Sequence, residues 1–155
     1  MRNTWTLSAG MLTGILLMVF GLASAPATSH AGSQATVTVD VVSGKKGSSG
    51  VDSSAKKHAR LLSRVGGFGG WKLAKSLRLD VGEGKTVSQG VGKRSFSATL
   101  HSLSAEHARA TFIVVDPAGK DHKVSSRLTN GASTIIVAET ASGAGVQVFI
   151  IRVRY

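Results

Sequence analysis

Cysteine is absent from this sequence and acidic residues are scarce, with 8 Asp and Glu against 19 Lys and Arg. Without cysteine the chain has no disulfide scaffold, no thiol catalysis and no Cys-ligated zinc site. Aromatic residues make up only 5% of the chain, whereas hydrophobic residues make up 42%, which excludes wholesale disorder. A length of 155 residues is enough for one domain with its own core, but too short for a multidomain enzyme.

The N-terminus has the three parts of a secretory signal. Arg2 is the only early charge, an apolar run covers residues 9–23, and small residues dominate 24–31. Because a signal peptidase accepts small side chains before its cleavage point, we expect a cut after Ala31. Residues 1–31 are therefore predicted to be a cleaved signal peptide.

Cleavage leaves residues 32–155 as a single β-rich domain that is exported, to the periplasm or outside the cell. The alternative is an N-terminal membrane anchor that stays uncleaved. A helix over residues 9–23 would reach roughly 22 Å at about 1.5 Å per residue, short of a hydrocarbon core of about 30 Å. Extending the helix back to Trp5 nearly closes this gap, so the anchor remains a second interpretation. No later segment has the length and apolarity of a further membrane helix.

Apolar and polar residues alternate along most of the exported domain, which is typical of half-buried β-strands. In the first such segment Val37, Val39 and Val41 share one face. Lys75 interrupts the apolar face of the second segment, which indicates an open end of the sheet or a β-bulge there. Strands are expected over residues 35–42, 71–81, 86–91, 94–103, 107–115, 120–128, 133–138 and 146–154.

These segments predict a mainly β fold: an antiparallel β-sandwich or small barrel of about eight strands. One short helix is expected near the start of the mature chain, over 55–64, capped by Ser53 or Ser54 and ended by Gly66-Gly67. The Gly/Ser/Lys segment at 43–53 is expected to be flexible. An outer-membrane barrel is a less favoured alternative, because the one Trp and one Tyr of the mature chain cannot form two aromatic girdles.

Two glycines lie between the aromatic residues Phe68 and Trp71. They are expected to let the helix approach the following strand closely while the aromatic rings fill the remaining gap.

Three features together resemble small exported bacterial β-rich proteins of unassigned activity. They are a short helix ending in Leu62-x-x-Val65, the sequence Phe-Gly-Gly-Trp-Lys-Leu at 68–73, and a late strand containing Phe149-Ile150-Ile151. The resemblance covers residues 59–155. It implies an exported β-rich domain and brings no catalytic residues with it.

Motifs of known catalytic sites are incomplete in this chain. Gly84-Lys85-Thr86 ends like a phosphate-binding loop, but Leu79 stands where that loop needs its first glycine. Ser54 and Lys57 have the Ser-x-x-Lys spacing without the partner motifs of penicillin-binding enzymes.

The histidines His58, His101, His107 and His122 lack the spacing of metal-ligand pairs and are expected to be solvated surface residues. His101 and His107 lie on neighbouring predicted strands, where a turn can bring them towards each other. No pair of acids stands out as the two carboxylates of a glycosidase. We therefore predict that the chain is not an enzyme and has no catalytic residues, no metal and no cofactor. A small hydrolase with an unrecognised site is the alternative.

The one positive signal is a basic segment, defined by Lys45, Lys46, Lys56, Lys57, Arg60 and Arg64. Asp52 is the only acid between Lys45 and Arg64, so the local net charge is +5. On a helix, Lys57, Arg60 and Arg64 would share one face, where a polyanion would gain from charge attraction and counterion release.

The expected function is an exported, non-catalytic binding or structural module of the bacterial cell envelope. The alternative is a secreted polyanion-binding protein that uses the basic segment. The partner is expected to be an envelope protein or an anionic polymer or lipid surface. Sequence-specific nucleic-acid binding is not expected, because the spacing of the aromatic residues suits core packing more than base stacking.

The signal-peptide interpretation predicts that the exported protein begins at Gly32. Intact-mass spectrometry of protein expressed with its full N-terminus, from the cell envelope or the medium, measures this directly. A product that retains Arg2 would favour the membrane anchor.

Overall fold

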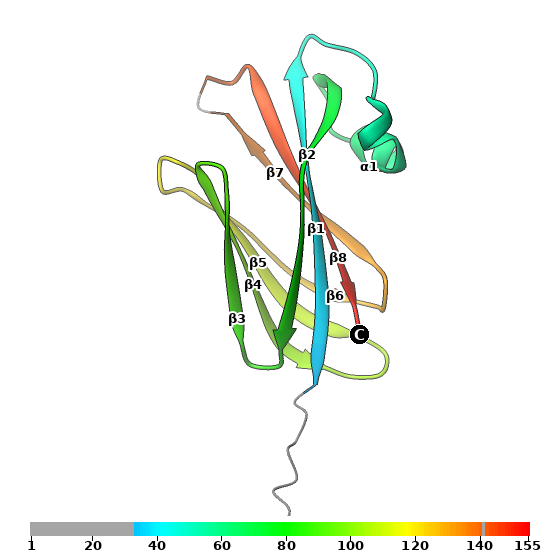
Figure 1. Cartoon of the computed structure of the whole chain (residues 1–155), viewed down its shortest axis with the longest axis vertical. Helices are drawn as coiled ribbons and strands as arrows, with labels where there is room; N and C mark the ends of the chain where they lie inside the picture. The colour runs from blue at the N-terminus through cyan, green and yellow to red at the C-terminus, as the bar shows by residue number, and fades with distance from the viewer. Residues whose placement is uncertain (1–32, 141) are drawn as a thin grey trace, which may run out of the picture. The chain divides into compact units, whose positions relative to one another are not determined.

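The computed structural model describes residues 33–140 and 142–155. The predicted signal peptide at residues 1–31 lies outside the described residues. Eight strands and one short helical segment follow one another along the described chain (Figure 1). Within this part of the chain, no helix is long and apolar enough to cross a membrane.

The eight expected strands are confirmed, and they form two antiparallel sheets of four strands each. The first sheet has the order β2-β1-β8-β7 and the second β3-β4-β5-β6. Two separate sheets correspond to the sandwich alternative and not to one sheet closed on itself. The strand bounds are β1 Gln34–Lys46, β2 Phe68–Gly82, β3 Thr86–Val91, β4 Arg94–Leu103, β5 Ala108–Val115, β6 Asp121–Leu128, β7 Ser133–Glu139 and β8 Gly145–Arg154.

β1 extends further than the side-chain pattern indicates. The segment 43–53 was expected to be flexible from its first residue, but β1 continues to Lys46. Ser43 pairs with Lys72 of β2 and with Gln147 of β8, so neighbours on both sides hold its backbone. Pairing of the backbone therefore continues the strand beyond the last alternating apolar residue, and only residues 47–52 connect β1 to the helical segment.

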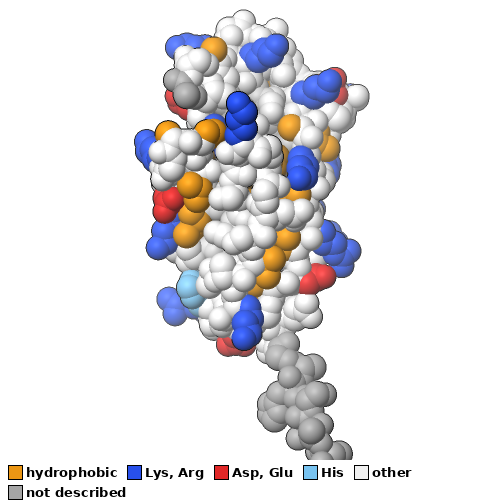
Figure 2. Space-filling model, turned by 60° about the vertical axis from the view of Figure 1, so that its left-hand side comes forward, with side chains coloured by type: hydrophobic (Ala, Val, Ile, Leu, Met, Phe, Trp, Pro, Cys, Tyr) orange, Lys and Arg blue, Asp and Glu red, His pale blue; other side chains and the backbone are white. Residues whose placement is uncertain are grey.

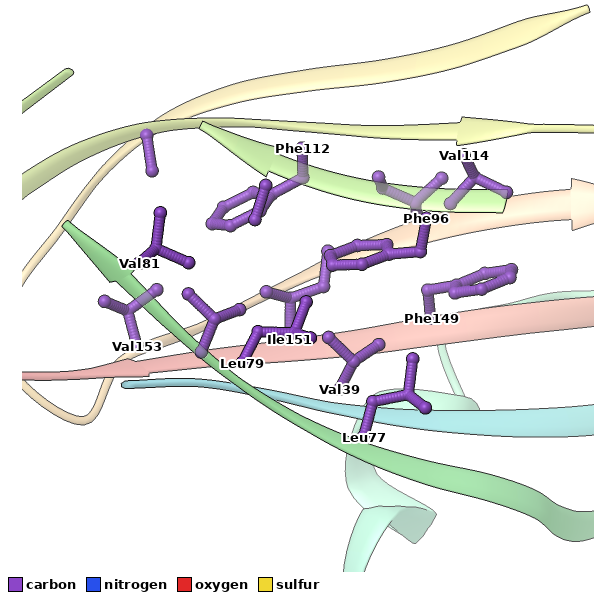
Figure 3. Packing of buried hydrophobic residues seen from close by; sticks show 14 of the residues in the cluster. Val39, Leu77, Leu79, Val81, Phe96, Phe112, Val114, Phe149, Ile151 and Val153 are labelled. Carbon is purple, nitrogen blue, oxygen red and sulfur yellow. The ribbon is translucent and has the colours of Figure 1, made fainter. Parts of the chain in front are cut away.

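The core between the two sheets centres on three fully buried phenylalanines (Figure 3). Phe96 of β4 stacks against Phe112 of β5 and against Phe149 of β8, with ring centroids 6.3 Å apart in each pair. Because Phe149 belongs to the first sheet and the other two to the second, this stack joins the two layers.

A second apolar cluster lies on the outer face of the first sheet, beneath the helical segment. Val42 and Val148 point away from the main core and pack with Trp71, Ala55 and Leu62. The apolar residues on both faces of β8 are thereby explained, since β8 is a central strand covered on both sides.

The helical segment differs from the expected helix over 55–64. It consists of a 3₁₀ helix η1 (Ser53–His58) and a single α-helical turn α1 (Ala59–Leu62). Ser54 Oγ accepts a hydrogen bond from Leu73 N at 3.2 Å, and Asp52 N donates to Trp71 O at 2.8 Å. These bonds hold the start of the segment against β2, so tertiary contacts override the preference of these residues for a regular α-helix.

The glycine pair does permit a close approach, at Gly69, but the prediction that the helix makes this approach is wrong. A Cβ atom there would lie 2.1 Å from the backbone oxygen of Ser48. The segment that approaches is the connection after β1 rather than the helix itself. Trp71 and Phe68 fill space in the second apolar cluster, as expected.

Two cationic side chains link the sheets. Lys75 Nζ of β2 donates to Gly90 O of β3 at 3.1 Å. Arg94 of β4 is 8% exposed and donates to the carbonyls of Ala138 and Glu139 in β7, at 3.2 and 2.8 Å.

Lys75 also lies at a break in the register of β1 and β2. Val41 pairs with Lys75, whereas the next residue, Val42, pairs with Leu73. This shift confirms the bulge, one of the two alternatives predicted at Lys75.

Gly69→Ala is expected to lower the free energy of unfolding by about 1–3 kcal/mol, because its methyl group would overlap a backbone atom. Gly90→Ala is the matched control, since a Cβ at Gly90 meets nothing within 4 Å. Urea unfolding of the three proteins measures the difference. Equal stability of both variants would contradict the close-approach argument.

Candidate functional site

Asp40 is a carboxylate on the outer face of β1, only 7% exposed where the helical segment covers the sheet. Its Oδ2 lies 2.8 Å from His58 Nε2 and 2.8 Å from Lys57 Nζ, both of η1. Its Oδ1 accepts a hydrogen bond from Ser76 Oγ of β2. Side chains of η1 and β2 therefore converge on one carboxylate of β1. We call these four residues the Asp40 cluster: Asp40, Lys57, His58 and Ser76.

The surroundings of Asp40 keep it ionised. Burial by itself would raise the pKa of this carboxyl, but the hydrogen bonds from Lys57, Ser76 and His58, together with the charge of Lys57, outweigh burial and lower the pKa. The cluster therefore holds a carboxylate anion at neutral pH.

The expectation that His58 is a solvated surface residue is wrong, because its exposure is only 5%. The helical segment packs His58 against the sheet, where Asp40 provides a charged partner. One sequence signal could have revealed this: Val41 and Val42 are consecutive apolar residues, and this break in alternation marks the point where both faces of β1 become covered.

The order of groups in the Asp40 cluster does not match a catalytic triad. In a triad the histidine lies between the nucleophile and the acid. Here the serine hydroxyl and the imidazole both bind the carboxylate, and no hydroxyl bonds His58 among the described residues. The arrangement fixes η1 and positions Lys57 rather than activating a nucleophile.

The other three histidines have separate partners. His101 Nε2 lies 2.8 Å from Thr111 Oγ1, and His107 Nδ1 lies 3.0 Å from a guanidinium nitrogen of Arg127. His122 Nε2 lies 3.5 Å from Asp116 Oδ2. His101 and His107 therefore do not hydrogen-bond each other. Across residues 33–140 and 142–155 there is no group of three metal-ligating side chains.

The basic segment is distributed over several elements. Lys45 and Lys46 end β1, Lys56 and Lys57 lie on η1, Arg60 lies on α1, and Arg64 follows α1. Lys57 turns to Asp40, and its side chain remains 60% exposed. The single α-helix that was predicted to carry Lys57, Arg60 and Arg64 does not form, because Lys57 belongs to η1, Arg60 to α1, and Arg64 follows α1. The other five cations make no ion pair within the described chain.

Two arginines of the last strand join Lys57 around a hollow of 200 Å³ beside Asp40. Arg152 and Arg154 alternate with the core residues Ile151 and Val153, so they point to the outer face of the sheet. Sequence analysis missed this grouping, although the alternation in 150–154 carries the signal for it. What the sequence could not show is that η1 folds over to the same face.

A larger groove of 800 Å³ lies among the β3–β4 and β5–β6 turns and the adjacent ends of β7 and β8. Its charged residues include both signs, with Lys93 and Lys120 beside Asp116 and Glu139. With Arg94 the groove has three cations and two acids, a smaller excess of positive charge than the hollow beside Asp40.

Comparisons of the chain with models of protein families, with curated proteins and with solved structures find no match.

Asp40→Asn is expected to lower the free energy of unfolding at about pH 7 by about 1–3 kcal/mol, because buried His58 loses its charged acceptor. The folded-state pKa of Asp40 is lowered from 3.8, so its stabilisation is fully present above that value and is lost as the pH falls through the folded-state pKa. The stability gap between wild type and variant should therefore narrow on acidification below about pH 4. Urea unfolding over a series of pH values measures the gap.

Asp80→Asn is the control for this substitution, because Asp80 is exposed and bonds only Thr36 Oγ1, at 2.8 Å. It should change stability by less than about 0.5 kcal/mol. A gap for Asp40→Asn that stays constant with pH would contradict the assignment of a carboxylate anion at this position.

Proposed function

We propose that this chain is an exported, non-catalytic binding module of the cell envelope whose ligand is an anionic polymer. The observation that carries the proposal is a cationic surface with almost no acidic partners. All 19 Lys and Arg except Arg2 lie in the described part of the chain, and among them only Lys57 is paired with a carboxylate. Figure 2 shows Lys and Arg spread over one whole face of the molecule, with few acids between them.

Unpaired cations favour a polyanion for two physical reasons. They attract it through their summed field, and they release its bound counterions when they replace them. Exposed charges are screened beyond about 8 Å at physiological ionic strength, so cations act together only where they are close. The hollow beside Asp40 provides such a grouping, and the basic segment adds five further cations within residues 45–64.

The Asp40 cluster supports a binding role over catalysis, because its groups satisfy one another and leave His58 without a nucleophile. The scarcity of exposed apolar side chains favours a polymer over an envelope protein or a lipid surface as the ligand. In the described residues the only large exposed hydrophobic side chains are Val51 and Val137, at 37% and 38% exposure, on the connection before η1 and on β7. A large contiguous apolar patch would mark a protein or membrane interaction site, and these two valines lie on separate parts of the chain.

The exported domain is expected to bind heparin and to lose affinity steeply as salt concentration rises, because binding releases counterions. Affinity measured over a salt series tests this, with neutral dextran as the uncharged control. Failure of the wild-type domain to bind heparin and polyphosphate at low salt would end the proposal.

The contribution of the basic segment is measured by replacing Lys45, Lys46, Lys56, Arg60 and Arg64 with Gln, leaving Lys57 to bind Asp40. The control replaces five exposed cations elsewhere: Lys85, Lys93, Arg109, Lys120 and Lys123. We expect the first variant to lose more affinity than the second. Equal loss would remove the basic segment from the binding surface.

A further inference from the structure

We infer that the hollow beside Asp40 is the subsite that takes one phosphate or sulfate group of the anionic polymer, held by Lys57, Arg152 and Arg154. This inference rests on the proposed function and deepens it, because it names the chemical group recognised and the residues that recognise it. Of its three cations only Lys57 belongs to the basic segment, so the subsite extends beyond the surface that sequence analysis indicates.

The register of the first sheet brings the two arginines together on one face. Residues two apart on a strand point the same way, so Arg152 and Arg154 lie about 7 Å apart along β8. Thr38 of β1 is directly opposite Arg152 and also lines the hollow. On its other side Thr38 pairs with Arg78 of β2, which places a further cation along the same row of the sheet.

Lys57 completes the subsite from a different element. It reaches the hollow because η1 folds over the outer face of the sheet, and its Nζ is fixed 2.8 Å from Asp40 Oδ2. His58 beside it is 5% exposed and also lines the hollow. The subsite therefore has a rigid wall built from buried groups, with two arginines facing that wall.

The balance of charge in the hollow favours an anion. Among the described residues Asp40 is the only acid that lines it, and its two oxygens already accept hydrogen bonds from Ser76, His58 and Lys57. Lys57, Arg152 and Arg154 are three cations against this one carboxylate, which leaves two positive charges without an acid. Guanidinium groups present planar pairs of N–H donors that match the oxygens of phosphate and sulfate.

The size of the hollow selects one charged group rather than a whole small molecule. Its 200 Å³ is below the roughly 300–1,000 Å³ of pockets that enclose drug-sized ligands. A larger anionic ligand therefore places one charged group in the hollow and continues outside it, as a polymer does. Arg78, exposed on the neighbouring strand, lies where an adjacent charged group of the same polymer would pass.

The test compares the double variant Arg152→Gln/Arg154→Gln with the control Arg109→Gln/Lys123→Gln. Both remove two exposed cations, but the control pair lies on the outer face of the second sheet. Titration calorimetry with heparin and with polyphosphate gives the affinities. We expect a roughly ten- to hundredfold loss for the first variant and less than about threefold for the control, because hydrogen bonds to charged groups are lost only in the first.

A second readout locates the bound group. Inorganic phosphate and sulfate should shift the backbone amide NMR signals of Thr38 and Arg152 in the wild-type domain, but not those of Thr38 in the double variant. Both variants should retain wild-type thermal unfolding, because all four substituted side chains are exposed.

Equal affinity losses in the two variants would overturn the subsite while leaving the proposed function intact, because the polymer would then respond to net charge alone. Absence of heparin and polyphosphate binding by the wild type would instead end the proposed function. Stronger binding to vesicles containing phosphatidylglycerol than to either polymer, lost in the same double variant, would overturn the polymer as the source of the anionic group.

Discussion

A buried carboxylate must keep its hydrogen-bond donors, and the outer face of the first sheet is organised around that requirement at Asp40. The donors come from β2 and η1, so Asp40 holds the helical segment at a defined place on the sheet. The apolar contacts of Leu62 and Trp71 beneath that segment add burial, but they do not by themselves fix its position along the strands. Because Lys57 is one of these donors, the hydrogen bonds of Asp40 also determine the position of the Lys57 ammonium beside Arg152.

No disulfide joins the two layers of the sandwich, because the chain has no cysteine, so noncovalent side-chain contacts hold the layers together. The stack of Phe96 against Phe112 and Phe149 supplies apolar burial at the centre, where it is insensitive to salt. Lys75 and Arg94 add directional contacts nearer the edges by donating to carbonyls of the opposite sheet. An arginine as buried as Arg94 is stable there because its donors have partners.

Most of the fold could be predicted from alternation alone, because each strand buries one face and the pattern of side chains records it. The errors occur where contacts between distant elements decide the structure. Ser43 belongs to a strand because two neighbours pair with its backbone, and side-chain character does not record that pairing. Lys57 and His58 leave the expected α-helical faces because Asp40, eighteen residues before His58, binds both. The basic segment was visible in the sequence, whereas the proximity of Lys57 to Arg152 depends on how η1 folds over the outer face of the first sheet.

The position of Arg94 also bears on how copies of this domain meet one another. β7 is an edge strand, and an unprotected edge strand offers free backbone groups to which a strand of a second molecule can add. Of the last two residues of β7, Ala138 directs its carbonyl to β8 and Glu139 directs its carbonyl to the open edge. Arg94 donates to both, so it covers the free carbonyl of Glu139 and places a buried charge at that point. A second copy cannot extend the sheet through this end without displacing the guanidinium, so the residue that joins the two layers also hinders edge-to-edge aggregation.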